Sequence, residues 1–213
     1  MNGFIFTLLL IVFIIWLRYE LNKSKRHMNE SSDNFWEAED KANSTRKQSI
    51  DNLDYICLDT KPFTVSTITN CGDTYVDEFV RTITSLADKK ILNLTGITNT
   101  ELKSMYGAAN ITKLSEYDEN YTQLVNTISR LGERLISLGL KSEATAILEY
   151  GVDIGSDVGA NYYMLANLYK ENGEHDKTNK LLLAASSLNT INKTAIINRI
   201  NSIRTSDSGT SKL

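Results

Sequence analysis

Hydrophobic and polar positions follow three successive patterns along this chain. Residues 4–17 (FIFTLLLIVFIIWL) contain a single polar side chain, that of Thr7. A helix that is apolar on every face cannot be placed in water, so this run predicts a segment that lies in lipid. A polar stretch comes next. From residue 73 onward, apolar residues recur at intervals of three and four, which predicts amphipathic helices.

The apolar run predicts a transmembrane anchor. As a helix, residues 4–17 span roughly 21 Å, which falls short of the roughly 30 Å hydrocarbon core of a bilayer. Uncharged residues extend the run at its start, and Trp16, Arg18 and Tyr19 suit the membrane interface at its end. A cleaved signal peptide needs a basic region before the run and small residues after it, and the chain has neither. We therefore assign residues 1–21 to an uncleaved anchor.

Basic residues set the expected orientation of this anchor. The first 28 residues carry a net charge of +3, all of it from residues that follow the apolar run, and the rest of the chain carries −6. Because basic residues mark the cytoplasmic side, we expect a single-pass protein of the cell membrane with its N-terminus outside and its C-terminal domain in the cytoplasm. The predicted membrane-interface residues are Trp16, Arg18, Tyr19, Lys23, Lys25 and Arg26.

The polar stretch predicts a juxtamembrane helix and a linker over residues 22–72. Its Glu, Lys, Arg and Ala residues favour a helix that starts near Asp33 or Asn34, where such side chains cap helices. Phe35 and Trp36 are the aromatic residues of this helix. They could dock on the membrane surface or on the domain, and simple packing is the interpretation we favour.

Two further local signals come before the repeats described below. The stretch PFTVSTIT alternates enough to predict a short strand. After it, Thr74 and Asp77 resemble a capping box at the start of an amphipathic helix. A second short helix is predicted at Thr98, which has Glu101 three positions later, and Gly107 is placed to end that helix.

Between residues 127 and 187 the chain repeats itself with a period of 34 residues. Positions of matching size recur in the pairs Leu131 and Leu165, Gly132 and Ala166, Leu135 and Tyr169, Gly139 and Gly173, Ala144 and Thr178, Leu148 and Leu182, and Gly151 and Ala185. Small residues let two helices approach closely, and glycine supplies a tight turn between them. The period is the length of one helix–turn–helix repeat.

The segment NYYMLANLYKENGEHDKTNKLLLAASSLN resembles the tetratricopeptide (TPR) repeat family. The resemblance implies an all-α fold in which helix pairs stack into a superhelix, with repeats at about residues 125–188. The segment TAIINRINSIR predicts a C-terminal capping helix. Since two repeats fall short of the usual three, helices after residue 73 are expected to pack at the N-terminal end.

The predicted helical domain therefore covers residues 73–205, and a disordered tail covers residues 206–213. The stretch ILNLTGITNTELKSMYGAAN, followed by LSEYDENYTQL, also resembles an uncharacterised family of membrane-anchored proteins from Gram-positive bacteria.

Candidate chemistry is sparse in the rest of the sequence. The acidic charge of the chain after residue 28 disfavours a nucleic-acid partner. His27 and His175 have no paired ligand spacing, and no phosphate-cradling glycine loop occurs. Cys57 and Cys71 could pair, but two free thiols in a reduced compartment are the simpler interpretation. The sequence thus predicts no catalysis, no cofactor and no metal site.

The resemblance implies a binding function instead. Repeat arrays present the first helix of each pair on an inner face that holds a peptide or a partner helix. By repeat position, this face carries Asn126, Ser129, Glu133, Ile136, Tyr163, Asn167, Lys170 and Glu171. We expect a membrane-tethered protein–protein interaction adaptor. The alternative is a structural subunit of a membrane-associated assembly that self-associates through its helical ends.

Overall fold

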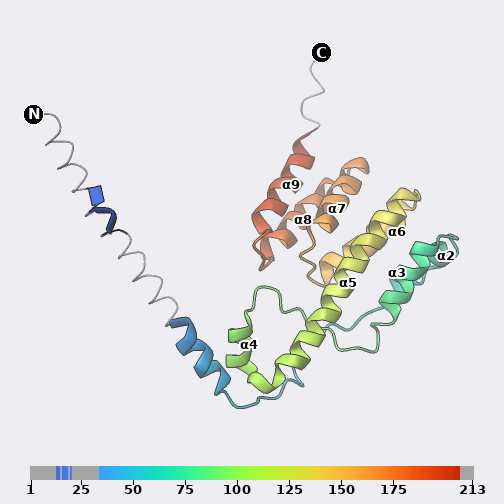
Figure 1. Ribbon diagram of the computed structural model, residues 1–213. Coiled ribbons are helices and arrows are strands. Elements are labelled where there is room, and N and C mark those ends of the chain that lie inside the picture. Colours follow the sequence, from blue (N-terminus) through green and yellow to red (C-terminus); the bar gives the residue numbers. More distant parts are fainter. Residues whose placement is uncertain (1–12, 15, 19, 21–33, 207–213) are drawn as a thin grey trace, which may run out of the picture. The chain divides into compact units, whose positions relative to one another are not determined.

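The computed structural model describes residues 13, 14, 16–18, 20 and 34–206. Within this part of the chain every regular element is a helix and no strand occurs, so the protein is all-α (Figure 1). The chain divides into two compact units. A smaller one contains residues 34–49 and 98–111, and a larger one contains residues 50–97 and 112–206.

Most of the predicted anchor lies outside the described residues, as does nearly all of the predicted C-terminal tail. The interface residues outside them are Tyr19, Lys23, Lys25 and Arg26. Trp16 and Arg18 are described, and both side chains are exposed. A search of the described helices finds none with the length and hydropathy required to cross a bilayer.

The smaller unit joins the helical residues 34–43 to α4 (Asn99–Tyr106) and the short η2 (Ala108–Asn110). The start predicted for the first of these helices, near Asp33 or Asn34, lies at the edge of the described residues. The carboxylate of Glu39 connects the two longer helices. It accepts a hydrogen bond from the Thr100 hydroxyl at 2.7 Å and forms an ion pair with Lys103. This acidic side chain therefore ties the 34–43 helix to α4.

Helix α4 begins and ends where the sequence predicts. The side chain of Thr98 accepts a hydrogen bond from the Glu101 N–H at 3.3 Å, and the Glu101 carboxylate accepts one from the Thr98 N–H at 2.7 Å. This reciprocal capping box satisfies two N–H groups that a helix start leaves without intrahelical partners. Gly107 ends the helix with a φ of 83°.

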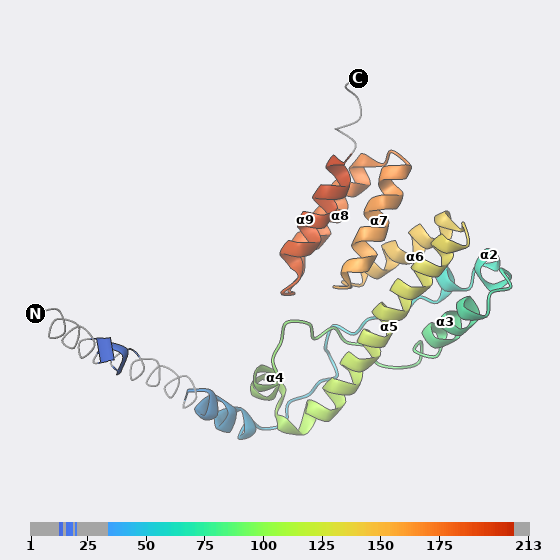
Figure 2. The same ribbon diagram turned by 45° about the horizontal axis from the view of Figure 1, so that its top comes forward.

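Eight helices form the larger unit. They are η1 (Lys61–Phe63), α2 (Ser66–Thr69), α3 (Thr74–Thr84), α5 (Ile111–Ser137), α6 (Lys141–Asp153), α7 (Gly159–Glu171), α8 (His175–Ser187) and α9 (Lys193–Thr205), counted over the described residues. Figures 1 and 2 show α3 and α6 beside α5, and α8 and α9 beside α7. Buried side chains of α3, α5 and α6 share one hydrophobic cluster, and those of α7, α8 and α9 share a second.

The short strand predicted for PFTVSTIT is wrong, because this stretch forms η1 and α2. Phe63 and Ile68 are buried, whereas Val65 between them is exposed. The apparent alternation thus comes from two anchoring side chains on neighbouring helical turns. Without a partner strand in the described chain, the backbone satisfies its hydrogen bonds locally.

The cap of helix α3 lies one residue earlier than the sequence predicts, and the helix begins at Thr74. Its N-cap is Asp73, not Thr74, and the Asp73 carboxylate accepts hydrogen bonds from the N–H groups of Tyr75 and Val76 at 3.1 Å each. Aspartate is among the best N-cap residues because it satisfies these N–H groups. Helix α3 supplies the neighbour that the repeats were expected to need, since its buried side chains join those of α5 and α6.

The two turns that connect α5 to α6 and α7 to α8 have the same geometry. Gly139 and Gly173 both have positive φ, 80° and 71°. The next N–H donates across the turn, from Leu140 to the Leu135 carbonyl at 2.9 Å and from Glu174 to the Tyr169 carbonyl at 2.8 Å. This is the Schellman ending of a helix. Helices α6 and α8 follow these turns, and their first residues lie 34 positions apart.

The C-terminal helix α9 covers the end of the array. Ile196, Ile200 and Ile203 are buried in the second cluster with side chains of α7 and α8. These isoleucines recur at three and four positions, which places them on one face of the helix. The capping role predicted for this segment agrees with their burial.

Alanine substitutions at the repeat turns should destabilise the larger unit. We expect Gly173→Ala to lower the free energy of unfolding by about 1–2 kcal/mol, because a Cβ atom disfavours the left-handed conformation. Apart from the adjoining residues, no atom lies within 4 Å of a Cβ built on Gly139 or Gly173, so a steric clash should add nothing to this cost. Gly139→Ala should behave alike, and Gly173→Asn should cost less. Urea unfolding measures these differences, and a neutral Gly173→Ala variant would contradict the turn geometry.

Candidate protein-binding surface

The structure places the eight predicted face residues in different environments. Four side chains on α5 and α7 are exposed, those of Asn126, Glu133, Asn167 and Glu171. Three are partly buried, those of Ile136, Tyr163 and Lys170. Ser129 is only 8% exposed. The accessible part of the predicted face is therefore the first group, with Ile136 and Tyr163 packed against the hydrophobic core beneath it.

Polar contacts hold several of these side chains in place. The Asn167 amide donates to the Tyr163 carbonyl at 2.9 Å, and Glu171 forms an ion pair with Lys141 at 2.6 Å. Lys170 donates to the Ser206 hydroxyl at 2.6 Å. The Glu171 pair stabilises little on its own, because both partners are about half exposed and solvent screens them. Asn167 and Glu171 thus remain accessible to a partner.

A groove of about 370 Å³ lies between α3 and α5. Its lining residues are Tyr75, Phe79, Arg130, Glu133, Arg134 and Ser137. Glu133 is the predicted face residue that lines it. The arginines stack on the aromatic rings, with Arg130 Cζ 4.9 Å from the Phe79 ring centroid and Arg134 Cζ 5.5 Å from that of Tyr75.

Asp73 fixes one side of this groove. Its carboxylate accepts hydrogen bonds from Arg134 Nη2 at 2.5 Å and from Arg134 Nε at 3.1 Å, so α3 is tied to α5 at the residue that caps α3. The Arg134 guanidinium, assisted by the backbone N–H groups of Val76 and Tyr75, holds the pKa of Asp73 below its ordinary value although desolvation opposes this. Asp73 in turn raises the pKa of Arg134.

Sequence reasoning missed this groove, although the sequence contains a signal for it. Tyr75 and Phe79 are four residues apart, and so are Arg130 and Arg134. Residues at this spacing lie on one face of a helix, so two antiparallel helices can match them pairwise. Recognising the match requires knowing that α3 and α5 are neighbours, which the repeat pattern alone does not specify.

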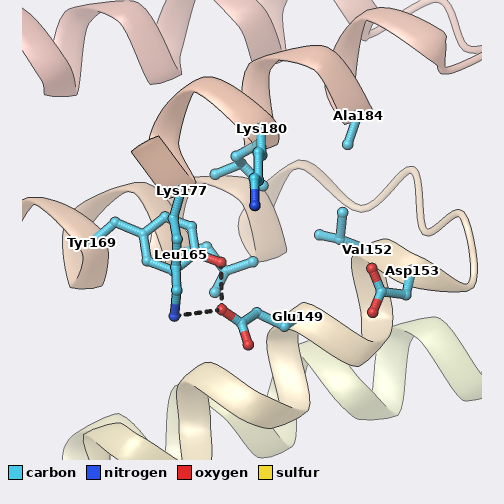
Figure 3. A pocket seen from close by; sticks show the side chains of 9 residues that line it. Glu149, Val152, Asp153, Leu165, Tyr169, Lys177, Lys180 and Ala184 are labelled. Atoms are coloured by element: carbon cyan, nitrogen blue, oxygen red, sulfur yellow. Dashed lines mark hydrogen bonds and ion pairs between the residues drawn. The ribbon is translucent and has the colours of Figure 1, made fainter. Parts of the chain in front are cut away.

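A second cavity, of about 270 Å³, opens between α6, α7 and α8 (Figure 3). Val152, Leu165, Leu181 and Ala184 are its apolar lining residues, and the others are Glu149, Asp153, Tyr169, Lys177 and Lys180. Glu149 Oε1 accepts hydrogen bonds from the Tyr169 hydroxyl at 2.8 Å and from Lys177 Nζ at 3.2 Å.

Burial in this cavity, with the neighbouring carboxylates, keeps Tyr169 protonated. Burial, and after it the Glu149 carboxylate, raises the pKa of Tyr169 far above its ordinary value. Glu174 and Glu149 raise the pKa of Lys177. The Lys177 Nζ atom lies 3.1 Å from Glu174 Oε2 and 5.4 Å from the centroid of the Tyr169 ring. A protonated tyrosine and a charged lysine that share one carboxylate hold α6, α7 and α8 together.

The cysteines and histidine of the described chain lie outside both cavities. Cys57 is exposed, Cys71 is partly buried, and both are free thiols. His175 is exposed at the start of α8. A search of the described residues finds no group of three or more His, Cys, Asp or Glu side chains that could hold a metal ion.

Comparison with protein-family models, with curated proteins and with solved structures finds no match. The function of this chain is therefore inferred from its own fold and surfaces.

Substitutions of Asp73 should separate its charge from its capping role. Asp73→Asn keeps a capping side chain but loses the charge that Arg134 pairs with, and Asp73→Ala loses both. At about pH 7 we expect melting temperatures to fall by a few degrees in the order wild type, Asp73→Asn, Asp73→Ala. Because the pKa of Asp73 is lowered in the folded state, the advantage of the wild type over Asp73→Asn should be lost as the pH falls below about 4.

Thermal unfolding followed by circular dichroism across this pH range measures the effect. Glu116→Gln removes an exposed carboxylate on α5 and serves as the control, for which we expect little change at any pH. An unchanged difference between the wild type and Asp73→Asn at about pH 2 would contradict the proposed charge pairing.

Proposed function

We propose that this protein is a membrane-tethered adaptor that binds another protein and catalyses no reaction. In this proposal the apolar residues 4–17 cross the cell membrane, and a TPR-like helical array in the cytoplasm holds a peptide or a helix of the partner. The described surfaces contribute shape, charge and aromatic rings, which are the properties that a binding surface needs.

The observation that carries this proposal is the duplicated helix turn. Two Schellman endings lie 34 residues apart, each with a glycine of positive φ, and each leads into a helix of 13 residues. Repeated helix pairs with this period are typical of TPR-like arrays, whose common use is to present the first helix of each pair to a partner.

The composition of the accessible face supports a protein partner. Glu133, Asn167 and Glu171 offer polar contacts, and Glu133 adjoins a groove where Tyr75 is exposed and Arg130 is stacked on Phe79. Tyrosine, phenylalanine and arginine are enriched in protein interfaces because they combine large apolar area with polar contacts. A partner seated on α5 next to α3 would therefore meet both kinds of side chain.

The charge pattern near the start of the chain supports the tether and its orientation. The basic residues Arg18, Lys23, Lys25 and Arg26 follow the apolar run directly. Such a cluster favours the cytoplasmic side and adds attraction to anionic headgroups, at about 1 kcal/mol per residue near the surface.

A structural subunit that self-associates is the second candidate function. Leu183 on α8 is 72% exposed, and Ile191 in the connection to α9 is 99% exposed. Two large apolar side chains in water at this end of the array would suit a contact between copies.

Site-specific photo-crosslinking in cells distinguishes the two candidates. We replace Glu133 or Asn167 with a photoreactive residue. If the protein is an adaptor, both positions should crosslink to the same other protein and so give adducts of the same mass. The controls are Ser142 and Ser186, which are exposed on the second helices α6 and α8 and should not form these adducts. Adducts only with further copies of the chain would support the structural subunit, and adducts no stronger than at the control positions would contradict the adaptor.

Thiol labelling tests the expected orientation separately. In a Cys71→Ser variant, Cys57 is the remaining cysteine, and its side chain is exposed. A membrane-impermeant maleimide should label it only after the cells are permeabilised. Full labelling of intact cells would place the helical domain outside and overturn the proposed orientation.

A further inference from the structure

Phe35 and Trp36 form an exposed aromatic pair in the first described turn of the 34–43 helix. Their side chains are 52% and 60% exposed, and their rings meet edge to face with centroids 5.4 Å apart. The packing expected for them from the sequence is therefore absent from the described structure, apart from this mutual contact. Two adjacent large aromatic rings in water point to a surface that covers them.

The smaller unit itself does not cover this pair. The side of the 34–43 helix that meets α4 is marked by the fully buried Ala42 and by Glu39, which binds Thr100 and Lys103. Glu39 lies three and four positions beyond the aromatic residues, and Ala42 lies six and seven positions beyond them. Phe35 and Trp36 thus lie in the described part of the helix that is nearer in sequence to the predicted anchor, and we call this pair the aromatic tip.

The chain between the anchor and this tip keeps the rings within reach of a membrane surface. Arg18 and Asn34 are 16 positions apart in the sequence, so no more than about 55 Å of chain separates them. That segment contains Lys23, Lys25 and Arg26, which attract anionic headgroups. Tryptophan favours the headgroup region because its ring combines an apolar body with a polar N–H group, and phenylalanine supplies apolar surface of the kind that interfacial helices bury at the acyl boundary.

The acidic residues of the same helix limit how much of it can insert. Glu37 and Asp40 are exposed and prefer water, and Glu39 is already paired with Lys103. Only the tip therefore suits the bilayer. We propose that Phe35 and Trp36 dock in the headgroup region of the membrane and give the protein a second contact with the lipid surface. This proposal rests on the anchor described under the proposed function.

The two tryptophans of the chain allow a direct test, because one lies in the predicted anchor and the other at the tip. Trp16→Phe leaves Trp36 as the sole reporter, and Trp36→Phe leaves Trp16. Each full-length variant is reconstituted into phosphatidylcholine vesicles with or without bromine on the acyl chains. If the tip docks, Trp36 should lose roughly half of its fluorescence, most strongly with bromine placed close to the headgroups.

The outcomes separate the anchor from the tip. Quenching of both tryptophans supports both proposals. Quenching of Trp16 without Trp36 overturns the docking and leaves the anchor standing. If neither is quenched, both proposals fail, and quenching of Trp36 alone supports docking and overturns the anchor. If bromine does not quench the Trp36 emission but the emission shifts with protein concentration, the tip contacts a second copy of the chain. This result overturns lipid docking.

Two further variants in the Trp16→Phe background test the role of the pair. Phe35→Ala should reduce the quenching of Trp36, because half of the inserted surface is lost. Lys41→Ala changes an exposed residue further along the same helix and should leave the quenching unchanged. Equal effects of the two variants would contradict docking through the aromatic tip.

Discussion

The stacked part of this protein depends on the close approach of α5 and α6. A Cβ atom on Gly132 would lie 2.5 Å from the Leu148 side chain, and one on Gly151 would lie 2.9 Å from Ile128. Each helix therefore presents a glycine to a bulky side chain of the other. Gly151 also meets α7, since its Cβ would lie 2.8 Å from the Asn161 amide. With less room at these positions, the three helices could not pack at this distance.

This packing decides which side chains remain on the surface. Leu131, Leu148 and Leu165 are fully buried by it, whereas Glu133 and Asn167 on the same first helices stay exposed. The hydrogen bonds between Asp73 and Arg134 then hold α3 against α5. The groove lined by arginine and aromatic side chains forms between these two helices, beside the exposed face. The candidate binding surface is thus a consequence of how the helices pack.

Local signals in the sequence predicted those features that depend on neighbouring residues. Examples are the capping box at Thr98, the turns at Gly139 and Gly173 and the apolar face of α9. The residues that form each of these features lie within one or two turns of a helix, or within one repeat, of each other. Features that depend on distant residues were missed. The burial of Ser129 and the groove beside it are examples, since the groove pairs α5 with residues more than fifty positions earlier. The smaller unit likewise joins Glu39 to Lys103 across the intervening chain.

A double-mutant cycle on Gly132 and Leu148 tests the central contact most directly. Gly132→Ala alone should cost about 1–3 kcal/mol through overpacking, and Leu148→Ala alone about 2–5 kcal/mol through a cavity. If these side chains compete for the same space, the double variant should be less destabilised than the sum of the single variants by about 1 kcal/mol or more, because the added methyl group fills part of the cavity. Denaturant unfolding provides all four free energies. Effects that add to within about 0.5 kcal/mol would show that the two residues are not in contact, and would contradict the packing on which the array depends.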